Sequence, residues 1–149
     1  MIASAEAYAL IKRFEGLRLQ SYRDAGGIWT IGWGHTPSSA NHVIDEDMAS
    51  ELLSSDVERI SQALSGLITC PVLEQHRFDA LVSFSYNVGI TALAHSELLK
   101  YVNLGQFGEA SKEFLKWDRA AGEVLPGLRS RRQAEKDLFD GEGSALPAA

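Results

Sequence analysis

The sequence predicts an α+β domain in which a small β-hairpin lobe near the N-terminus packs on a larger α-helical lobe, with a cleft between them. Apolar residues recur at helical spacing over residues 7–14, and the composition then changes over 17–33 to β-branched and aromatic residues interrupted by Asp24-Ala25-Gly26-Gly27. From residue 48 onward the helical spacing returns and continues, in several segments, to residue 139.

The first helix and the hairpin have recognisable boundaries. Ser4 is a suitable N-cap, and Gly16 suits the left-handed position beyond a helix that ends near Glu15. After the hairpin, residues 37–39 are expected to form a loop, and residues 41–44 to add a short third strand.

The remainder of the chain is predicted to be helical. Asp45 can cap a helix that runs to Gly66, and the segment that begins at Pro71 is apolar on nearly every side, which is typical of a buried central helix. Further helices are expected from Ser96 to Val102, from Phe107 to Trp117 and from Pro126 to Phe139. Residues 1–149 are therefore predicted to be one domain, with the β-lobe at about 16–45 and a mobile tail at 141–149.

The composition excludes several classes of protein. The 149 residues are 45% hydrophobic and 23% charged, as in an ordinary globular domain. No apolar run is long enough to cross a bilayer, the first residues lack the pattern of a signal peptide, and the lone Cys70 cannot form an internal disulfide. We therefore expect synthesis in a cytoplasm without stable membrane insertion.

The charge is acidic overall but unevenly distributed. The net charge of −6 argues against a nucleic-acid partner. The basic stretch, residues 112–136, has seven basic and four acidic residues and so carries +3, which leaves −9 for the rest of the chain. This stretch is either the solvated face of a helix or a shallow cationic surface for an anionic polymer.

Three polar residues near the hairpin have the properties of a hydrolytic site. Glu15 faces the negative end of a helix dipole beside apolar residues, and both effects favour its protonated form, as a general acid requires. Asp24 lies in the hairpin turn, where exposure and turn amides favour a carboxylate, and Thr30 offers a hydroxyl on the returning strand. These are the components of an inverting glycosidase, although the residues alone also fit an ordinary helix end and an ordinary turn.

Four blocks of sequence resemble the phage-type lysozyme (endolysin, muramidase) family. They are Phe14-Glu15-Gly16-Leu17-Arg18-Leu19 with Tyr22-Arg23-Asp24 and Trp29-Thr30-Ile31-Gly32-Trp33-Gly34-His35-Thr36, then residues 78–89, then Trp117, and then residues 127–135. Glu15, Asp24 and Thr30 have the spacing of the family's catalytic residues. The resemblance implies that Glu15 is the general acid, that Asp24 is the electrostatic partner or base, and that Thr30 positions the hydrolytic water.

Other positions carry over from the same resemblance. It implies that Gly34 lets a sugar lie close to the second strand, and that Tyr86 and Asn87 line the floor of the cleft; core packing and a helix-end amide are the alternatives for these two. It also implies that Arg129 or Arg132 approaches the acid, the alternative being a plain surface arginine.

The histidines are predicted to have no role in metal binding. His35 is expected to bond a neighbouring acid and to stabilise the structure rather than take part in catalysis. His42, His76 and His95 have no ligand spacing, so we expect no metal site and no cofactor.

The resemblance implies an endolysin that hydrolyses the β-1,4 bond between N-acetylmuramic acid and N-acetylglucosamine in bacterial peptidoglycan. It further implies a monomer that stays in the host cytoplasm until a separate membrane pore protein releases it, and that then acts in the periplasm or cell wall. Two alternatives remain at this point, a lytic transglycosylase and a non-catalytic module that binds peptidoglycan. Asp24 and Thr30 argue against the first, since that reaction needs no positioned water.

Overall fold

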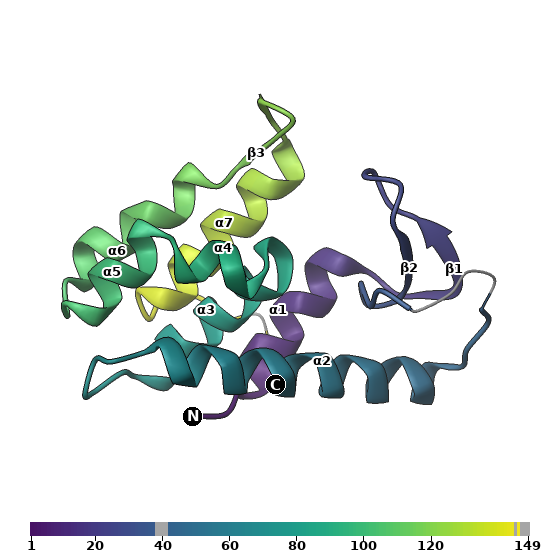
Figure 1. The fold of residues 1–149 in the computed structure, drawn as a ribbon, viewed down its shortest axis with the longest axis horizontal. Helices are drawn as coiled ribbons and strands as arrows, with labels where there is room; N and C mark the ends of the chain where they lie inside the picture. Colours follow the sequence, from purple (N-terminus) through teal and green to yellow (C-terminus); the bar gives the residue numbers. More distant parts are fainter. Residues whose placement is uncertain (38–41, 145, 147–149) are drawn as a thin grey trace.

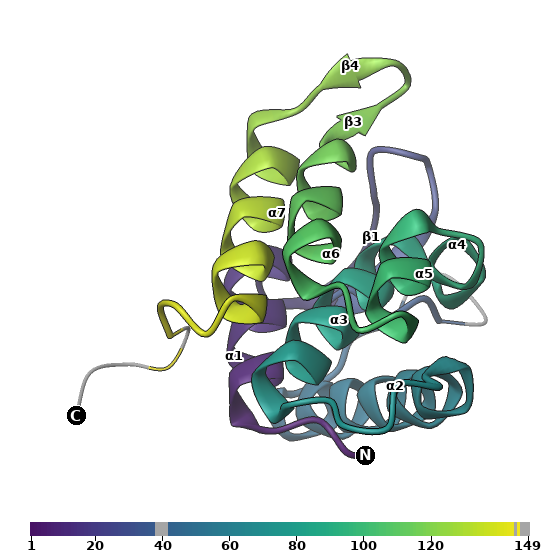
Figure 2. The ribbon, with the colours of Figure 1, turned by 90° about the vertical axis from the view of Figure 1, so that its left-hand side faces the viewer.

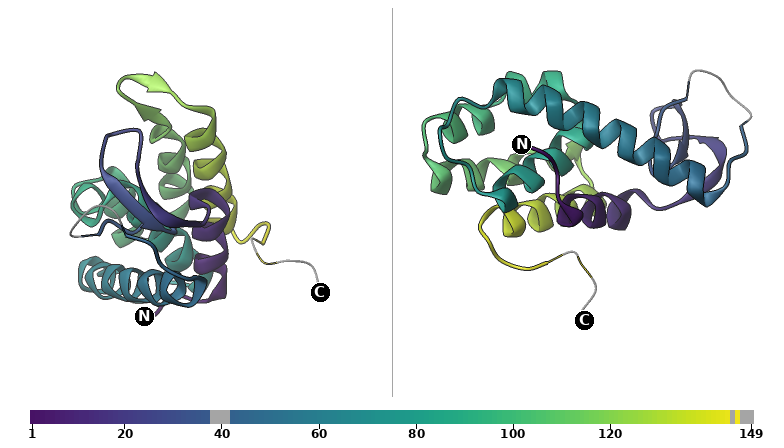
Figure 3. Two further views of the ribbon diagram at one scale, coloured as in Figure 1. Left: turned by 90° about the vertical axis from the view of Figure 1, so that its right-hand side faces the viewer. Right: turned by 90° about the horizontal axis from the view of Figure 1, so that it is seen from below.

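The structure, a computed structural model that describes residues 1–37, 42–144 and 146, places a hairpin lobe beside a larger helical lobe (Figures 1 and 3). The helices are α1 (Ala5–Glu15), α2 (Glu46–Leu67), α3 (Gln75–Val88), α4 (Ile90–Ala94), α5 (Glu97–Asn103), α6 (Phe107–Glu113) and α7 (Pro126–Phe139), with a 3-10 turn at Phe114–Lys116. The strands are β1 (Arg18–Arg23), β2 (Trp29–Gly32), β3 (Arg119–Ala120) and β4 (Glu123–Val124).

The hairpin lobe begins where α1 ends. Gly16 has a φ of +70°, and its amide donates to the carbonyl of Lys12, so the helix stops at Glu15 and the chain enters β1. β1 and β2 are antiparallel, with Tyr22 opposite Thr30. The third strand expected at residues 41–44 is present only as a single bridge between Val43 and Gln20. Residues 38 and 39 of the expected loop and residue 41 of the expected strand lie outside the described residues.

Helix α2 connects the two lobes. Its N-cap Asp45 accepts a hydrogen bond from the amide of Met48 at 2.8 Å, which confirms the predicted start. The helix then runs for 22 residues from beside the hairpin to the far end of the helical lobe (Figure 3).

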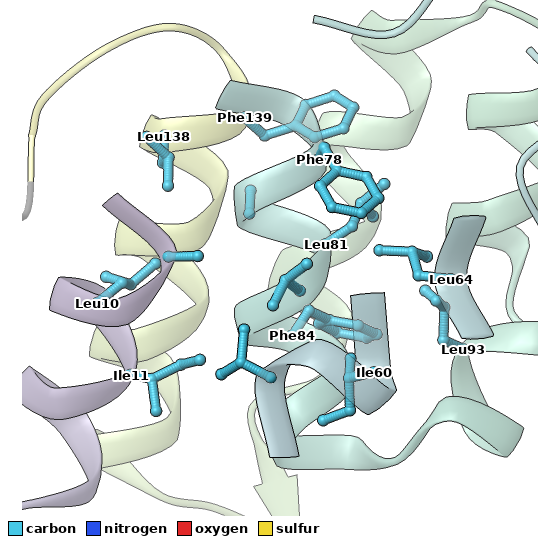
Figure 4. Close-up of a cluster of buried hydrophobic side chains, with 14 of the residues drawn as sticks. Leu10, Ile11, Ile60, Leu64, Phe78, Leu81, Phe84, Leu93, Leu138 and Phe139 are labelled. Carbon is cyan, nitrogen blue, oxygen red and sulfur yellow. The ribbon is translucent and has the colours of Figure 1, made fainter. Parts of the chain in front are cut away.

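Helix α3 is the centre of the helical lobe. Its residues from Phe78 to Ser85 are all buried, so the predicted central helix is confirmed. Figure 4 shows Phe78, Leu81 and Phe84 of α3 between Ile11 of α1 and the side chains of Ile60 and Leu64 of α2. Each such fully buried side chain contributes about 1.5–3 kcal/mol of hydrophobic stabilisation.

Three details of the helical lobe differ from the sequence expectations. Ser4 precedes α1, but its hydroxyl donates to Asp79 at 2.5 Å instead of capping the helix. The short helix α4 and the hairpin of β3 and β4 were not predicted, because each is too short to show a periodic pattern. At the start of the predicted tail, the amide of Glu142 donates to the carbonyl of Asp137 at 2.7 Å, and Ser144 donates to Glu6. Residues 145 and 147–149 of the tail lie outside the described residues, and its mobility remains a prediction.

The basic stretch does not form a free cationic surface. Arg131 and Arg132 are buried, and four of the other basic residues are paired with acids. These pairs are Lys112 with Glu109, Lys116 with Glu113, Arg129 with Asp118, and Lys136 with Asp140. The structure therefore favours the interpretation of this stretch as helix faces whose charges are locally neutralised.

Within the described residues, no helix combines the length and the apolar character that a bilayer span requires.

The turn between β3 and β4 contains a backbone conformation that is unfavourable for its residue. Figure 2 shows this hairpin beyond the ends of α6 and α7. Its turn residues Ala121 and Gly122 have φ values of +53° and +83°, and two consecutive positive φ angles are typical of a tight turn that favours Asn-Gly. Ala121 has no side-chain hydrogen bond to offset the cost of this conformation.

We expect Ala121→Asn to raise the free energy of unfolding by on the order of 1 kcal/mol, because asparagine tolerates the left-handed conformation better than alanine. Urea denaturation measures the change. Ala120→Asn, in the extended strand β3, is the control and should bring no gain. Equal or lower stability of the Ala121 variant would show that the turn is not strained.

Candidate active site

Glu15 lies where α1 meets the hairpin lobe. It is the last residue of α1, and its side chain is 19% exposed. Its Oε1 accepts a hydrogen bond from Nη1 of Arg131 at 3.2 Å, and the Arg131 side chain is only 3% exposed. The expected general acid is therefore reachable from solvent and held from behind by a buried cation.

The arginine beside Glu15 is not one of the two that were expected. Arg129 is on the surface, where its Nε lies 3.4 Å from Asp118, and Arg132 binds Asn87 through Nη2 at 2.7 Å. Successive residues of a helix point about 100° apart, so of these arginines on α7 it is Arg131 that is directed at Glu15. The expectation of a C-terminal arginine near the acid is correct, but the residue is Arg131.

Arg131 has further partners on two helices. Its Nε donates to Oε2 of Glu135, one turn later on α7, at 3.2 Å, and its Nη2 donates to the carbonyl of Ser83 on α3 at 3.2 Å. The Ser83 hydroxyl donates to Oε2 of Glu135 at 2.6 Å. Burial raises the pKa of Glu135, while Arg132, Arg131 and Ser83 act to lower it.

Gly34 is adjacent to Glu15 in space. Its φ is +85°, which strains any residue with a side chain, and a methyl group on it would come within 2.9 Å of Cδ of Glu15. The absence of a side chain at this position thus makes room for the acid itself. The expected contact of Gly34 with a sugar remains a prediction.

Tyr86 of α3 lies near enough to Glu15 to be affected by its charge. Its hydroxyl donates to the carbonyl of Trp33 at 2.5 Å, which ties α3 to the residue before Gly34. Burial raises the pKa of Tyr86 well above its ordinary value, and the negative charges of Asp56 and Glu15 raise it further. Tyr86 therefore stays protonated as a hydrogen-bond donor.

Asn87, the next residue on α3, is exposed. Its side-chain oxygen accepts from the buried Arg132, whose Nε also lies 3.0 Å from Oε1 of Glu135. This bond fixes the orientation of the amide, so that its NH₂ group is directed away from Arg132.

Asp24 and Thr30 are organised around one residue of the hairpin turn, Ile28. Oδ1 of Asp24 accepts from the amides of Gly26 and Ile28, both at 2.9 Å, so the carboxylate is anchored by the turn. The Thr30 hydroxyl donates to the carbonyl of Ile28 at 3.0 Å, and Thr30 is only 6% exposed. Because its hydrogen is used in this bond, Thr30 can offer only lone pairs to a further partner.

His35 bonds a neighbouring acid, as expected. Its Nδ1 lies 2.7 Å from Oδ2 of Asp56 on α2, and its backbone forms a bridge with Ile31. The contact ties the end of the hairpin to α2 and supports a structural role. In the part of the chain that the structure describes, no group of three or more histidine, cysteine, aspartate or glutamate side chains could hold a metal ion.

Comparison with known proteins identifies the family of the chain. The family model described as phage lysozyme matches residues 12–135. The chain belongs to the phage lysozyme family. It is 42% identical over 145 residues to an endolysin of Acyrthosiphon pisum secondary endosymbiont phage 1, in an alignment that covers 94% of this chain and 99% of the relative.

Two further similarities extend this result. The chain is 46% identical to an endolysin of Bacillus phage B103 over 134 residues, which cover 87% of this chain and 51% of that longer relative. In structure it resembles the muramidase domain of SpmX from Asticaccaulis excentricus, with a TM-score of 0.83 and 40% identity over 91% of this chain and 95% of that one. These relatives also confirm the predicted fold class.

In this family member, Gly34→Ala should reduce kcat by about 10²-fold, because the methyl group displaces the Glu15 carboxyl from its position. Steady-state turnover of peptidoglycan checks this. Gly105→Ala is the matched control: its φ of +71° imposes similar strain, but nothing lies within 4 Å of the added methyl group. A similar loss of kcat in both variants would attribute the effect to backbone strain alone.

Proposed function

We propose that this phage lysozyme hydrolyses the β-1,4 bond between N-acetylmuramic acid and N-acetylglucosamine in bacterial peptidoglycan, with Glu15 as the general acid. The observation that carries the proposal is the setting of Glu15 at the junction of the two lobes, held by Arg131 and accommodated by Gly34. A glycan strand that crosses this junction meets the carboxyl at the end of α1, and the acid protonates the leaving oxygen.

Asp24 and Thr30 hold the attacking water. Oδ1 of Asp24 is engaged by two turn amides, and the Thr30 hydroxyl is donated to Ile28. A water molecule can therefore donate one hydrogen to Asp24 and the other to Thr30, which leaves a lone pair for attack on the sugar. Glu15 protonates the leaving oxygen as the glycosidic bond breaks, and this water attacks from the opposite side of the sugar ring while its proton passes to Asp24, which together constitute an inverting hydrolysis.

Gly34, Tyr86 and Asn87 bind the sugar around the scissile bond. Asn87 contributes its exposed NH₂ group, which Arg132 orients through the amide oxygen. Tyr86 fixes the backbone at Trp33 and so the position of Gly34. The active protein is a monomer that stays in the host cytoplasm until a separate pore protein opens the inner membrane, and it then acts on the cell wall.

Glu15→Gln should lower the hydrolysis of purified peptidoglycan by at least ~10²-fold, because the amide keeps the volume of the side chain but cannot donate the proton. Turbidity of permeabilised cells and mass spectrometry of the digest measure the rate and the products. Wild type should release reducing ends, and circular dichroism should show the variant folded. Hydrolysis by the folded variant within threefold of wild type would exclude Glu15 as the acid, and anhydro ends from wild type would indicate a transglycosylase.

A further inference from the structure

We propose that Glu135 is a positioning residue for the reaction: it holds Arg131 against Glu15 and shares the charge of that arginine. The proposal rests on the proposed role of Glu15. Glu135 itself is 0% exposed and does not reach the substrate.

One guanidinium joins the two carboxylates through different nitrogens. Nη1 of Arg131 donates to Glu15 and Nε donates to Glu135, each at 3.2 Å. Ser83 holds the second carboxylate in place, since its hydroxyl donates to the same Oε2 atom at 2.6 Å and its carbonyl accepts from Nη2. With α7 bonded in this way to α3, Arg131 has little freedom to turn away from Glu15.

The arrangement resolves a conflict in the site. A cation beside Glu15 favours the ionised carboxylate, whereas a general acid must be protonated to act. Burial acts against the ionised form of Glu135, but Arg131 at 3.2 Å, Arg132 at 3.0 Å and the Ser83 hydroxyl at 2.6 Å favour it. With these three partners the carboxylate places a negative charge on the far side of the guanidinium, in a buried environment where charges are weakly screened. This charge offsets part of the effect of Arg131 on Glu15.

Two other groups act on Glu15 from the helices around it. Arg132 on α7 adds a positive charge, but it lies against Glu135 and Asn87, and Glu135 opposes its charge as well. Tyr86 on α3 is neutral, because burial and the charges of Asp56 and Glu15 raise its pKa. From the hairpin side the neighbour of Glu15 is the uncharged Gly34. Glu135 is thus the negative charge that balances the two arginines behind the acid.

The test is the pH profile of kcat for Glu135→Gln on short glycan oligomers of peptidoglycan. Glutamine keeps the shape of the side chain but removes its charge, so Glu15 should lose its proton more readily. We expect the pH at which activity falls on the alkaline side to decrease by about one unit, with activity at lower pH retained. Glu135→Asp, which keeps the carboxylate, should leave the alkaline limb of the pH profile close to its wild-type position.

The matched control is Glu113→Gln on α6. Glu113 is also buried and paired with a cation, Lys116, so its substitution disturbs the helical lobe in a similar way without contact to Glu15. Its pH profile should be unchanged. A purely structural role of Glu135 predicts lower stability of Glu135→Gln with an alkaline limb at its wild-type position, and that result would overturn the proposal.

A second variant keeps the test decisive if Glu135→Gln does not fold. Ser83→Ala removes the hydroxyl that favours the ionised form of Glu135, and it should shift the alkaline limb in the same direction by a smaller amount. No shift would overturn the proposal. Glu15→Gln distinguishes a failure of the proposed role of Glu15 from a failure of the proposed role of Glu135. If that variant is active, the proposed function of Glu15 fails. If it is inactive and the pH profile of Glu135→Gln is unshifted, only the role of Glu135 fails.

Discussion

The guanidinium of Arg131 connects three helices at the back of the candidate active site. It bonds Glu15 at the end of α1, Ser83 in the middle of α3 and Glu135 on its own helix, α7. Removing a charged group from water costs several kcal/mol, and this cost is offset only when all partners are correctly placed. The network therefore constrains how the three helices pack, and it restricts the position of Glu15 relative to the hairpin, which begins three residues later at Arg18.

This constraint links the hairpin to the chemistry. Glu15 is held from the helical lobe, whereas Asp24 and Thr30 are held by the turn around Ile28. Two further ties join the hairpin lobe to the helices: Tyr86 binds the carbonyl of Trp33, and His35 binds Asp56 on α2. In the proposed reaction, the acid and the two residues that bind water thus belong to different lobes. The polar contacts between the lobes fix the position of one group relative to the other.

Local patterns predicted much of this structure. The helix that ends at Glu15, the hairpin, the cap at Asp45 and the buried helix α3 follow from apolar spacing and from capping residues, which act within a few positions of the chain. The bond between His35 and an acid was also expected. The roles of Asp24 and Thr30, which the resemblance implies, remain predictions; the structure adds that the turn around Ile28 holds both side chains.

What could not be predicted depends on contacts between distant segments. Arg131 was missed in favour of its neighbours Arg129 and Arg132, because the sequence does not give the rotation of α7 about its axis. The spacing of Arg131 and Glu135, four residues apart in an otherwise amphipathic helix, is a signal that could have been used. Net charge was a poor guide to the surface for the same reason, since most cations of residues 112–136 are neutralised by partners that only the fold brings near.

The most direct measurement is a double-mutant cycle of unfolding free energies for Glu15→Gln and Arg131→Met. If Arg131 holds Glu15 as described, the two changes should be coupled by at least about 1 kcal/mol, whereas the same cycle with Arg129, which pairs with Asp118 on the surface, should be additive. Additivity of the Glu15 and Arg131 changes within about 0.5 kcal/mol would contradict the account.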